Sequence, residues 1–224
     1  MKHIVGEILY AVFFGFVLLA SAGTVKWQRA WILLSVLLII RTIGTWSILR
    51  VHRTLLDERA RLSLRRDQPL IDKLLLPGFT LSFVALVGFD GLDGYRLHLL
   101  GAPHGIVSDI GLLIFALGWC LVMVALRTNA FATTIVRHQH ERGHQVVSRG
   151  VYSHVRHPLY AGLVAVMVGM GLWLGSNAGA LASLIPTGIL ALRIHFEEEL
   201  LRRNLVDYAD YAARVRHRLI PGVW

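Results

Sequence analysis

The stretch "HPLYAGLVAVMVGMGLWLGSNAGALASLIPTGILALR", residues 157–193, decides the fold. It contains two apolar runs, 159–175 and 178–192, and the short turn sequence "GSNAG" separates them. Apolar runs of roughly 18 residues are typical of bilayer spans, and such spans are helical because backbone amides in lipid need partners in their own segment. The stretch therefore predicts a hairpin of two transmembrane helices whose outer ends lie close together on one side of the membrane.

The rest of the chain repeats this pattern. The chain has 224 residues, 55% of them hydrophobic, and its mean hydropathy is +0.57. Four further apolar runs precede the hairpin, at 4–22, 30–49, 74–89 and 106–126. The first run ends in "ASA", which resembles a signal-peptide cleavage site, but it is long for a signal peptide and Glu7 lies near its start. The sequence predicts an all-α, polytopic membrane protein with about six transmembrane helices.

Basic residues are distributed unevenly among the loops. Lys and Arg concentrate in 50–73, 127–158 and 193–224, which fall on one side of a six-span topology together with both termini. The positive-inside rule predicts that this side is cytoplasmic. The net charge of +9 then serves orientation and contact with anionic membrane lipid. No basic stripe on a soluble module indicates nucleic acid as a partner, and no obligate protein partner is indicated.

Two cytoplasmic segments have helical patterns outside the spans. Residues 50–73 mix Arg, Asp and Glu with Leu at helical spacing, which predicts a basic interfacial helix that ends near Pro69. Residues 193–224 carry Leu and Tyr at helical spacing and predict an amphipathic C-terminal helix. We therefore divide the chain into the transmembrane helices and interfacial helix of 1–136, and a core at 137–224 formed by a loop, the hairpin and the C-terminal helix.

Isolated polar residues in the spans have competing interpretations. Arg41 lies deep in the second span, where a charge is a candidate functional site, although its side chain could also reach the interface. Cys120 is the only cysteine, so no disulfide is expected, and we interpret it as a small buried apolar residue. The 11 histidines make no recognisable ligand pair, so we expect no metal site. No glycine-rich nucleotide motif is present.

Polar rings gather where the hairpin begins. Pro158 suits the first turn of a helix, because its missing N–H costs nothing there. Tyr152, His157 and Tyr160 surround this helix start. Histidine and tyrosine are also common at membrane interfaces, so each ring alone would be unremarkable. Together they predict a polar pocket at the lipid boundary.

The other end of the hairpin carries charges. Arg193 and Glu197 are four residues apart and share one helical face, whereas we expect Glu198 and Glu199 to point elsewhere. Antiparallel helices joined by a short turn have neighbouring ends, so Arg193 and Glu197 should lie near the rings that begin the hairpin. Arg193 and Glu197 could also simply pair with each other.

These two blocks carry a resemblance to a known family. "GHQVVSRGVYSHVRHPLYAG" (143–162), followed by "RIHFEEELL" (193–201) and "YADYAARVRHRLIPG" (208–222), is similar to the isoprenylcysteine carboxyl methyltransferase family. The wider group includes phospholipid methyltransferases and a membrane thiol methyltransferase. The resemblance covers about residues 137–221, and two separated motifs agree in order and spacing.

The resemblance implies a cofactor and a set of site residues. The family binds S-adenosylmethionine in a cytosol-facing pocket roofed by its C-terminal helices. The positions that the resemblance assigns to this cofactor are Gln139, His144, Gln145, Val146, Val147, Tyr152, His157, Pro158, Leu159, Tyr160 and Glu197. Arg193 is the implied catalytic residue and should face the methyl acceptor. The sequence departs from the family at Gln139, which is closer to His144 than usual, and at 205–207, where a Phe-Gly pair is absent.

The implied reaction moves a methyl group from S-adenosylmethionine to a lipophilic small-molecule or lipidated acceptor. A carboxylate acceptor is ionised at pH 7 and needs no general base, which favours carboxyl O-methylation. Thiol S-methylation and phospholipid N-methylation remain alternatives. More distant alternatives are a sterol-type reductase that uses NADPH and a membrane protein without enzymatic activity.

Overall fold

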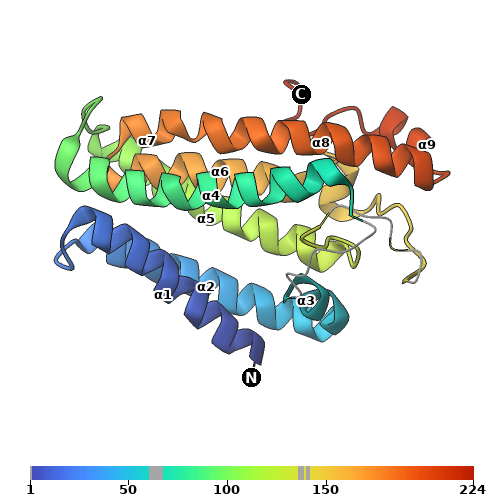
Figure 1. Ribbon diagram of the computed structural model, residues 1–224, viewed down its shortest axis with the longest axis horizontal. Coiled ribbons are helices and arrows are strands. Elements are labelled where there is room, and N and C mark those ends of the chain that lie inside the picture. Colours follow the sequence, from blue (N-terminus) through green and yellow to red (C-terminus); the bar gives the residue numbers. More distant parts are fainter. Residues whose placement is uncertain (1, 61–67, 136–138, 140–141) are drawn as a thin grey trace.

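The computed structural model describes residues 2–60, 68–135, 139 and 142–224. In this part of the chain, all regular secondary structure is helical (Figure 1). The helices are α1 (Lys2–Ala22), α2 (Gln28–Val51), α3 (Arg53–Ala60), α4 (Leu70–Leu92), α5 (Gly105–Thr128), α6 (Pro158–Leu174), α7 (Asn177–Ala182), α8 (Leu184–Asn204) and α9 (Tyr208–Arg214). A π-helical turn, Asp93–Leu97, extends α4, and a 3-10 turn, Gly150–Ser153, precedes α6. The expected boundary at 136/137 lies outside the described residues.

In the part of the chain that the structure describes, five helical segments are long and apolar enough to cross a membrane. They are Lys2–Ala22, Gln28–Val51, Leu70–Leu97, Gly105–Thr128 and Asn177–Asn204. The shorter α6, with 17 residues, is also apolar throughout and forms the first half of the expected hairpin. Much of the outer surface of these helices is apolar; Phe16 of α1, for example, is 68% exposed. The predicted all-α class with about six spans is confirmed, and the chain is an integral, multi-pass membrane protein.

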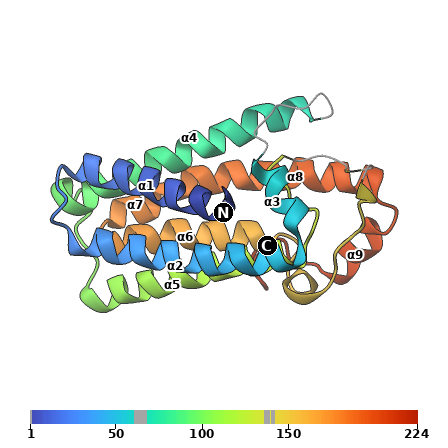
Figure 2. The same cartoon turned by 90° about the horizontal axis from the view of Figure 1, so that it is seen from below.

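The hairpin turns where the sequence placed its glycine-rich break. Gly175 ends α6 with φ of 86°, a left-handed conformation that glycine adopts without strain. The Ser176 hydroxyl then accepts a hydrogen bond from Gly179 N at 2.7 Å and caps α7. α6 also packs closely along α5 (Figures 1 and 2). The approach requires a glycine at position 118, because a Cβ there would lie only 2.8 Å from the carbonyl oxygen of Gly162. These features hold the base of the candidate site on a rigid pair of helices.

Two expected interfacial helices differ in extent from the structure. The helix of the last span does not stop at Leu192 but continues as α8 to Asn204. It breaks at 205–207, where the Phe-Gly pair is missing, and only the short α9 follows. A continuous amphipathic C-terminal helix is therefore the wrong description, because α9 folds back onto the bundle instead of extending along the interface. In the 50–73 segment α3 ends at Ala60, residues 61–67 lie outside the described part, and Pro69 precedes α4.

The charge in the second span has a partner in the first. Arg41 Nε donates to Glu7 Oε2 at 2.6 Å, and the guanidinium lies over the rings of Tyr10 and Trp119, 4.0 and 4.7 Å from their centroids. Thr45 Oγ1 donates to the other oxygen of Glu7 at 2.7 Å. This intramembrane pair fastens α1 to α2 and accounts for Arg41 structurally. The expected burial of Cys120 is wrong, because its side chain is exposed on the outer face of α5.

Candidate active site

A cavity of about 250 Å³ lies where the loop after α5, the start of α6, the end of α8 and α9 meet. All the residues that the sequence assigned to the site line it, except Gln139 and Pro158. The lining members are His144, Gln145, Val146, Val147, Tyr152, His157, Leu159, Tyr160, Arg193 and Glu197. The hairpin thus brings together two blocks that are far apart in sequence.

Gln139 and Pro158 support the site from behind. Gln139 is 1% exposed, and its Nε2 donates to the carbonyl of Phe131 at 2.7 Å. Arg142 Nη1 donates to Gln139 Oε1, so the amide braces the loop that carries His144. Pro158 is buried at the first position of α6, where it fixes the start of the helix. The structure therefore places Gln139 and Pro158 next to the cavity without making them part of its wall.

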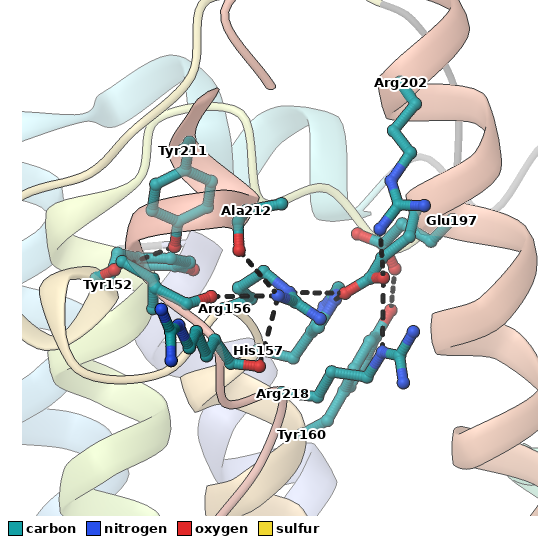
Figure 3. A network of polar contacts seen from close by, with 12 residues as sticks. Tyr152, Arg156, His157, Tyr160, Glu197, Arg202, Tyr211, Ala212 and Arg218 are labelled. Atoms are coloured by element: carbon teal, nitrogen blue, oxygen red, sulfur yellow. Dashed lines mark hydrogen bonds and ion pairs between the residues drawn. The ribbon is translucent and has the colours of Figure 1, made fainter. Parts of the chain in front are cut away.

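The two ends of the hairpin are joined by a hydrogen bond. Tyr160 OH donates to Glu197 Oε2 at 2.6 Å, and the His157 ring stacks on the Tyr160 ring with centroids 5.6 Å apart (Figure 3). Because α6 and α8 are antiparallel, two residues at the start of α6, His157 and Tyr160, share one wall with Glu197 near the end of α8. This wall presents a carboxylate, an imidazole and a phenol to the cavity.

Glu198 points away from the face that Arg193 and Glu197 share, as expected, but it is an ion-pair centre that the sequence analysis did not identify. It is 3% exposed and accepts hydrogen bonds from Arg156 Nε at 2.7 Å and Arg218 Nε at 3.2 Å, and its carboxylate lies 3.2 Å from His157 Nε2 (Figure 3). Arg156 Nη1 also donates to the carbonyl of Val215 at 2.9 Å. The segment after α9 is thereby fixed to the start of α6 and to α8.

The short α9 forms the roof of the cavity. Tyr211 OH donates to the carbonyl of Tyr152 at 2.8 Å, and Tyr208 lines the cavity beside it. Burial raises the pKa of Tyr211 to about 12 and also raises the pKa of Tyr152. Both phenols therefore remain protonated at neutral pH, and that of Tyr211 acts as a hydrogen-bond donor. The sequence pattern "YADYAAR" predicted a helix here but not which groups it would cover.

Arg193 pairs with a residue from α4 and not with Glu197. Its Nε donates to Asp72 Oδ1 at 2.9 Å, and its Nη2 donates to the carbonyl of Thr134. Gln68 Nε2 donates to the second oxygen of Asp72 at 2.7 Å. Arg193 and Asp72 are 5% and 2% exposed, so this is a buried ion pair. Nothing in the sequence marked Asp72, because it lies in the first turn of an apolar helix.

The guanidinium of Arg59 lines the cavity too, together with those of Arg193 and Arg156. It projects from α3, in the segment that the sequence predicted to be a basic interfacial helix. Its Nη1 donates to the carbonyl of Ala132 at 2.7 Å, and Thr134 Oγ1 lies 3.4 Å from the Arg59 carbonyl, which accepts its hydrogen bond. Asn129 and Phe131, at the end of α5, complete this side of the lining. No motif could have identified these residues, since they reach the cavity only through the packing of α3 against the loop after α5.

The cavity continues into an apolar wall. Leu76 and Phe79 from α4, Leu163 from α6 and Leu190 from α8 line this part. Figure 2 shows α4 tilting away from the other helices toward its N-terminal end, which is the end that carries this wall. The pocket therefore combines a polar half under α9 with an apolar half between transmembrane helices. Among the described residues, no three His, Cys, Asp or Glu side chains are grouped to hold a metal ion.

The fold and this pocket define a class: multi-pass, all-helical membrane proteins with a polar and apolar cavity at one end of the bundle. Comparison with known proteins shows what this chain is similar to. A model of the phospholipid methyltransferase family matches residues 107–207, which include most of the pocket. The chain is similar to isoprenylcysteine carboxyl methyltransferases, as its motifs predicted.

Three known proteins illustrate this similarity. Protein-S-isoprenylcysteine O-methyltransferase B of Arabidopsis thaliana is 32% identical over 115 residues, which cover 50% of this chain and 58% of the relative. Form A from the same plant is 31% identical over the same shares of the two chains. The structure of a eukaryotic intramembrane Ras methyltransferase, isoprenylcysteine carboxyl methyltransferase, has the same fold with a TM-score of 0.58 at 22% identity, covering 94% of this chain and 74% of that one. The match spans less than two thirds of the length of the curated relatives.

Proposed function

We propose that this protein is an integral-membrane methyltransferase that transfers a methyl group from S-adenosylmethionine to the carboxylate of a lipophilic acceptor. The observation that carries this proposal is the division of one cavity into a polar half and an apolar half. The polar half lies under α9 and suits a charged, water-soluble cofactor. The apolar half lies between α4, α6 and α8 and suits an acceptor with a hydrocarbon chain, such as an isoprenylated cysteine.

The polar half has the groups that such a cofactor requires. Residues 145–147 line the cavity in irregular conformation, and their backbone groups make no hydrogen bond within the described part of the chain. They can therefore bind the edge of an adenine ring. Tyr152, His157 and Tyr160 provide aromatic and polar contacts, and Glu197 can accept from an ammonium or hydroxyl group of the cofactor.

The reaction that we propose asks mainly for alignment of two bound molecules. The sulfonium cofactor supplies a methyl group, and the bond from methyl carbon to sulfur breaks as the bond to the acceptor oxygen forms, leaving a neutral thioether. A carboxylate gives up no proton in this displacement. The pocket residues therefore need to hold and orient the reactants and to exclude water, which the roof formed by α9 would do.

We further propose that the pocket opens toward the cytoplasm. The described parts of the basic segments 50–73, 127–158 and 193–224 lie at or near this end of the bundle (Figure 1), and the positive-inside rule assigns such an end to the cytoplasm. The cofactor would then enter from the cytosol and the acceptor from the membrane.

The test is direct. Purified protein in lipid nanodiscs is titrated with S-adenosylhomocysteine by calorimetry and then assayed with methyl-labelled S-adenosylmethionine. The acceptors are N-acetyl-S-farnesylcysteine, phosphatidylethanolamine and an alkyl thiol. Binding of S-adenosylhomocysteine and label in a base-labile ester support the proposal. Label only in the amine or the thioether would assign phospholipid or thiol methylation instead. Absence of S-adenosylhomocysteine binding would contradict methyltransferase activity altogether.

A further inference from the structure

Three arginines line the cavity, and one of them, Arg156, is paired with Glu198. The other two guanidinium groups, those of Arg193 and Arg59, are in different electrostatic states. Arg193 is compensated by the buried carboxylate of Asp72 at 2.9 Å, and its Nη2 is occupied by the Thr134 carbonyl. Arg59 donates to the carbonyl of Ala132, a neutral group, and makes no ion pair within the described part of the chain. One pocket thus holds a neutralised arginine beside an arginine whose charge is not balanced.

The surroundings of Arg59 make this imbalance costly. Burial and the neighbouring cations Arg41 and Arg193 lower the pKa of Arg59 to about 10, and the tyrosines Tyr160 and Tyr152 oppose this shift. An arginine remains charged at neutral pH even so. A buried charge is stable in a protein when an opposite charge and hydrogen bonds accompany it. The site therefore favours a ligand that brings a negative group.

The other charged groups described in the pocket do not neutralise Arg59. Glu198 is engaged by Arg156 and Arg218, and Glu197 accepts from Tyr160. Glu197 makes no ion pair with Arg59. The lining thus includes the Glu197 carboxylate and the Arg59 guanidinium, which do not pair with each other. In the proposed reaction Glu197 would serve the cofactor, which leaves Arg59 for the acceptor.

We propose that Arg59, and not Arg193, binds the carboxylate of the methyl acceptor, and that Asp72 holds Arg193 as a fixed part of the wall. This inference rests on the proposed carboxyl methylation. The planar guanidinium offers paired N–H donors that match the two oxygens of a carboxylate. Esterification removes the negative charge, so the product would lose this attraction and leave the site. Arg59 would therefore select the acid over its neutral derivatives.

The experiment compares two ligands that differ only in charge. N-acetyl-S-farnesylcysteine and its primary amide are titrated into the nanodisc protein saturated with S-adenosylhomocysteine. We expect the wild type to bind the acid about tenfold or more tightly than the amide, in keeping with a charge-assisted hydrogen bond. Arg59→Gln keeps a donor for the Ala132 carbonyl but removes the charge, and we expect it to bind the two ligands with similar affinity.

Three controls make the outcome decisive. Arg53→Gln removes a charge from an exposed position of the same helix α3 and should leave the preference intact. Arg59→Lys retains the charge without the fork and should retain only part of the preference. S-adenosylhomocysteine binding should remain within about twofold of wild type in each variant, which reports an intact pocket.

Several results would overturn the inference. One is an unchanged preference for the acid in Arg59→Gln, and another is loss of the preference in Arg193→Gln alone. Equal binding of acid and amide by a wild type that binds S-adenosylhomocysteine would also overturn it, while leaving a thiol or amine acceptor possible. Failure of the wild type to bind S-adenosylhomocysteine is a different result, because it contradicts the proposed function itself.

Discussion

The guanidinium of Arg193 on α8 lies 2.9 Å from the carboxylate of Asp72 on α4, a residue 121 positions earlier in the chain. Both side chains are almost completely buried. Arg193 lines the cavity, and Asp72 lies in the first turn of α4, the end at which α4 tilts away from the other helices (Figure 2). It ties a helix of the N-terminal half to the hairpin that carries the candidate cofactor site, so that the two halves of the chain build one pocket.

Removal of one partner of this pair should destabilise the protein. Arg193→Ala leaves Asp72 buried without its cation, and breaking a buried pair in this way costs about 3–5 kcal/mol. We expect a marked fall in the thermal unfolding midpoint in detergent, and partial recovery in the double variant Asp72→Ala/Arg193→Ala. Arg203→Ala, which breaks an exposed pair with Glu199, is the control and should change stability by less than about 1 kcal/mol.

The same variants test the role that the sequence assigned to Arg193. If Arg193 positions the acceptor, Arg193→Ala should keep S-adenosylhomocysteine affinity and stability while turnover falls steeply. If it mainly holds α4 against α8, stability and cofactor affinity should fall together. Wild-type stability together with wild-type turnover in Arg193→Ala would contradict both roles.

Glu198 should matter more for the integrity of the roof than Glu197 does. Glu198→Gln weakens its contacts with Arg156, His157 and Arg218, and the segment after α9 then loses its main attachment. We expect faster proteolysis near residues 205–218 and a loss of stability of about 3–5 kcal/mol. Glu199→Gln, one residue further along α8 and exposed, should behave as wild type. Equal protease resistance of all three proteins would show that the network is dispensable.

Glu197 should affect ligand affinity with little effect on stability. Its carboxylate lines the cavity and accepts from Tyr160 at 2.6 Å. In Glu197→Ala we expect S-adenosylhomocysteine to bind about 1–3 kcal/mol more weakly by calorimetry, which is the usual cost of losing a buried polar contact. Tyr160→Phe removes only the neighbouring donor and should have a smaller effect. An unchanged dissociation constant in Glu197→Ala would exclude it from the cofactor site.

The topology can be checked by cysteine labelling in a Cys120→Ala background. Leu99→Cys lies in the exposed loop between α4 and α5, and Arg149→Cys is exposed on the pocket side. A membrane-impermeant maleimide applied to oriented vesicles should label the two positions from opposite sides, with Arg149→Cys on the cytoplasmic side. Labelling of both positions from one side would contradict the six-span arrangement and the proposed orientation of the pocket.

The sequence by itself determined the spans and the hairpin, because hydrophobic length and the positions of glycine and proline are local properties. The apolar runs predicted the membrane helices, Pro158 and Gly175 predicted the limits of α6, and the hairpin predicted that Tyr160 and Glu197 would meet. Each of these depends on short segments whose geometry is the same in any membrane helix.

Only the tertiary structure decided which charges pair. Successive residues of a helix point about 100° apart, so the choice between Glu197 and Glu198 for the Arg156 contact depends on how α8 is rotated against α6. The pairing of Arg193 with Asp72 depends on the crossing of α4 and α8, and the entry of Arg59 depends on the packing of α3 against the loop after α5. Such contacts are set by side-chain packing between helices that are distant in sequence, and no local pattern of residues carries that information.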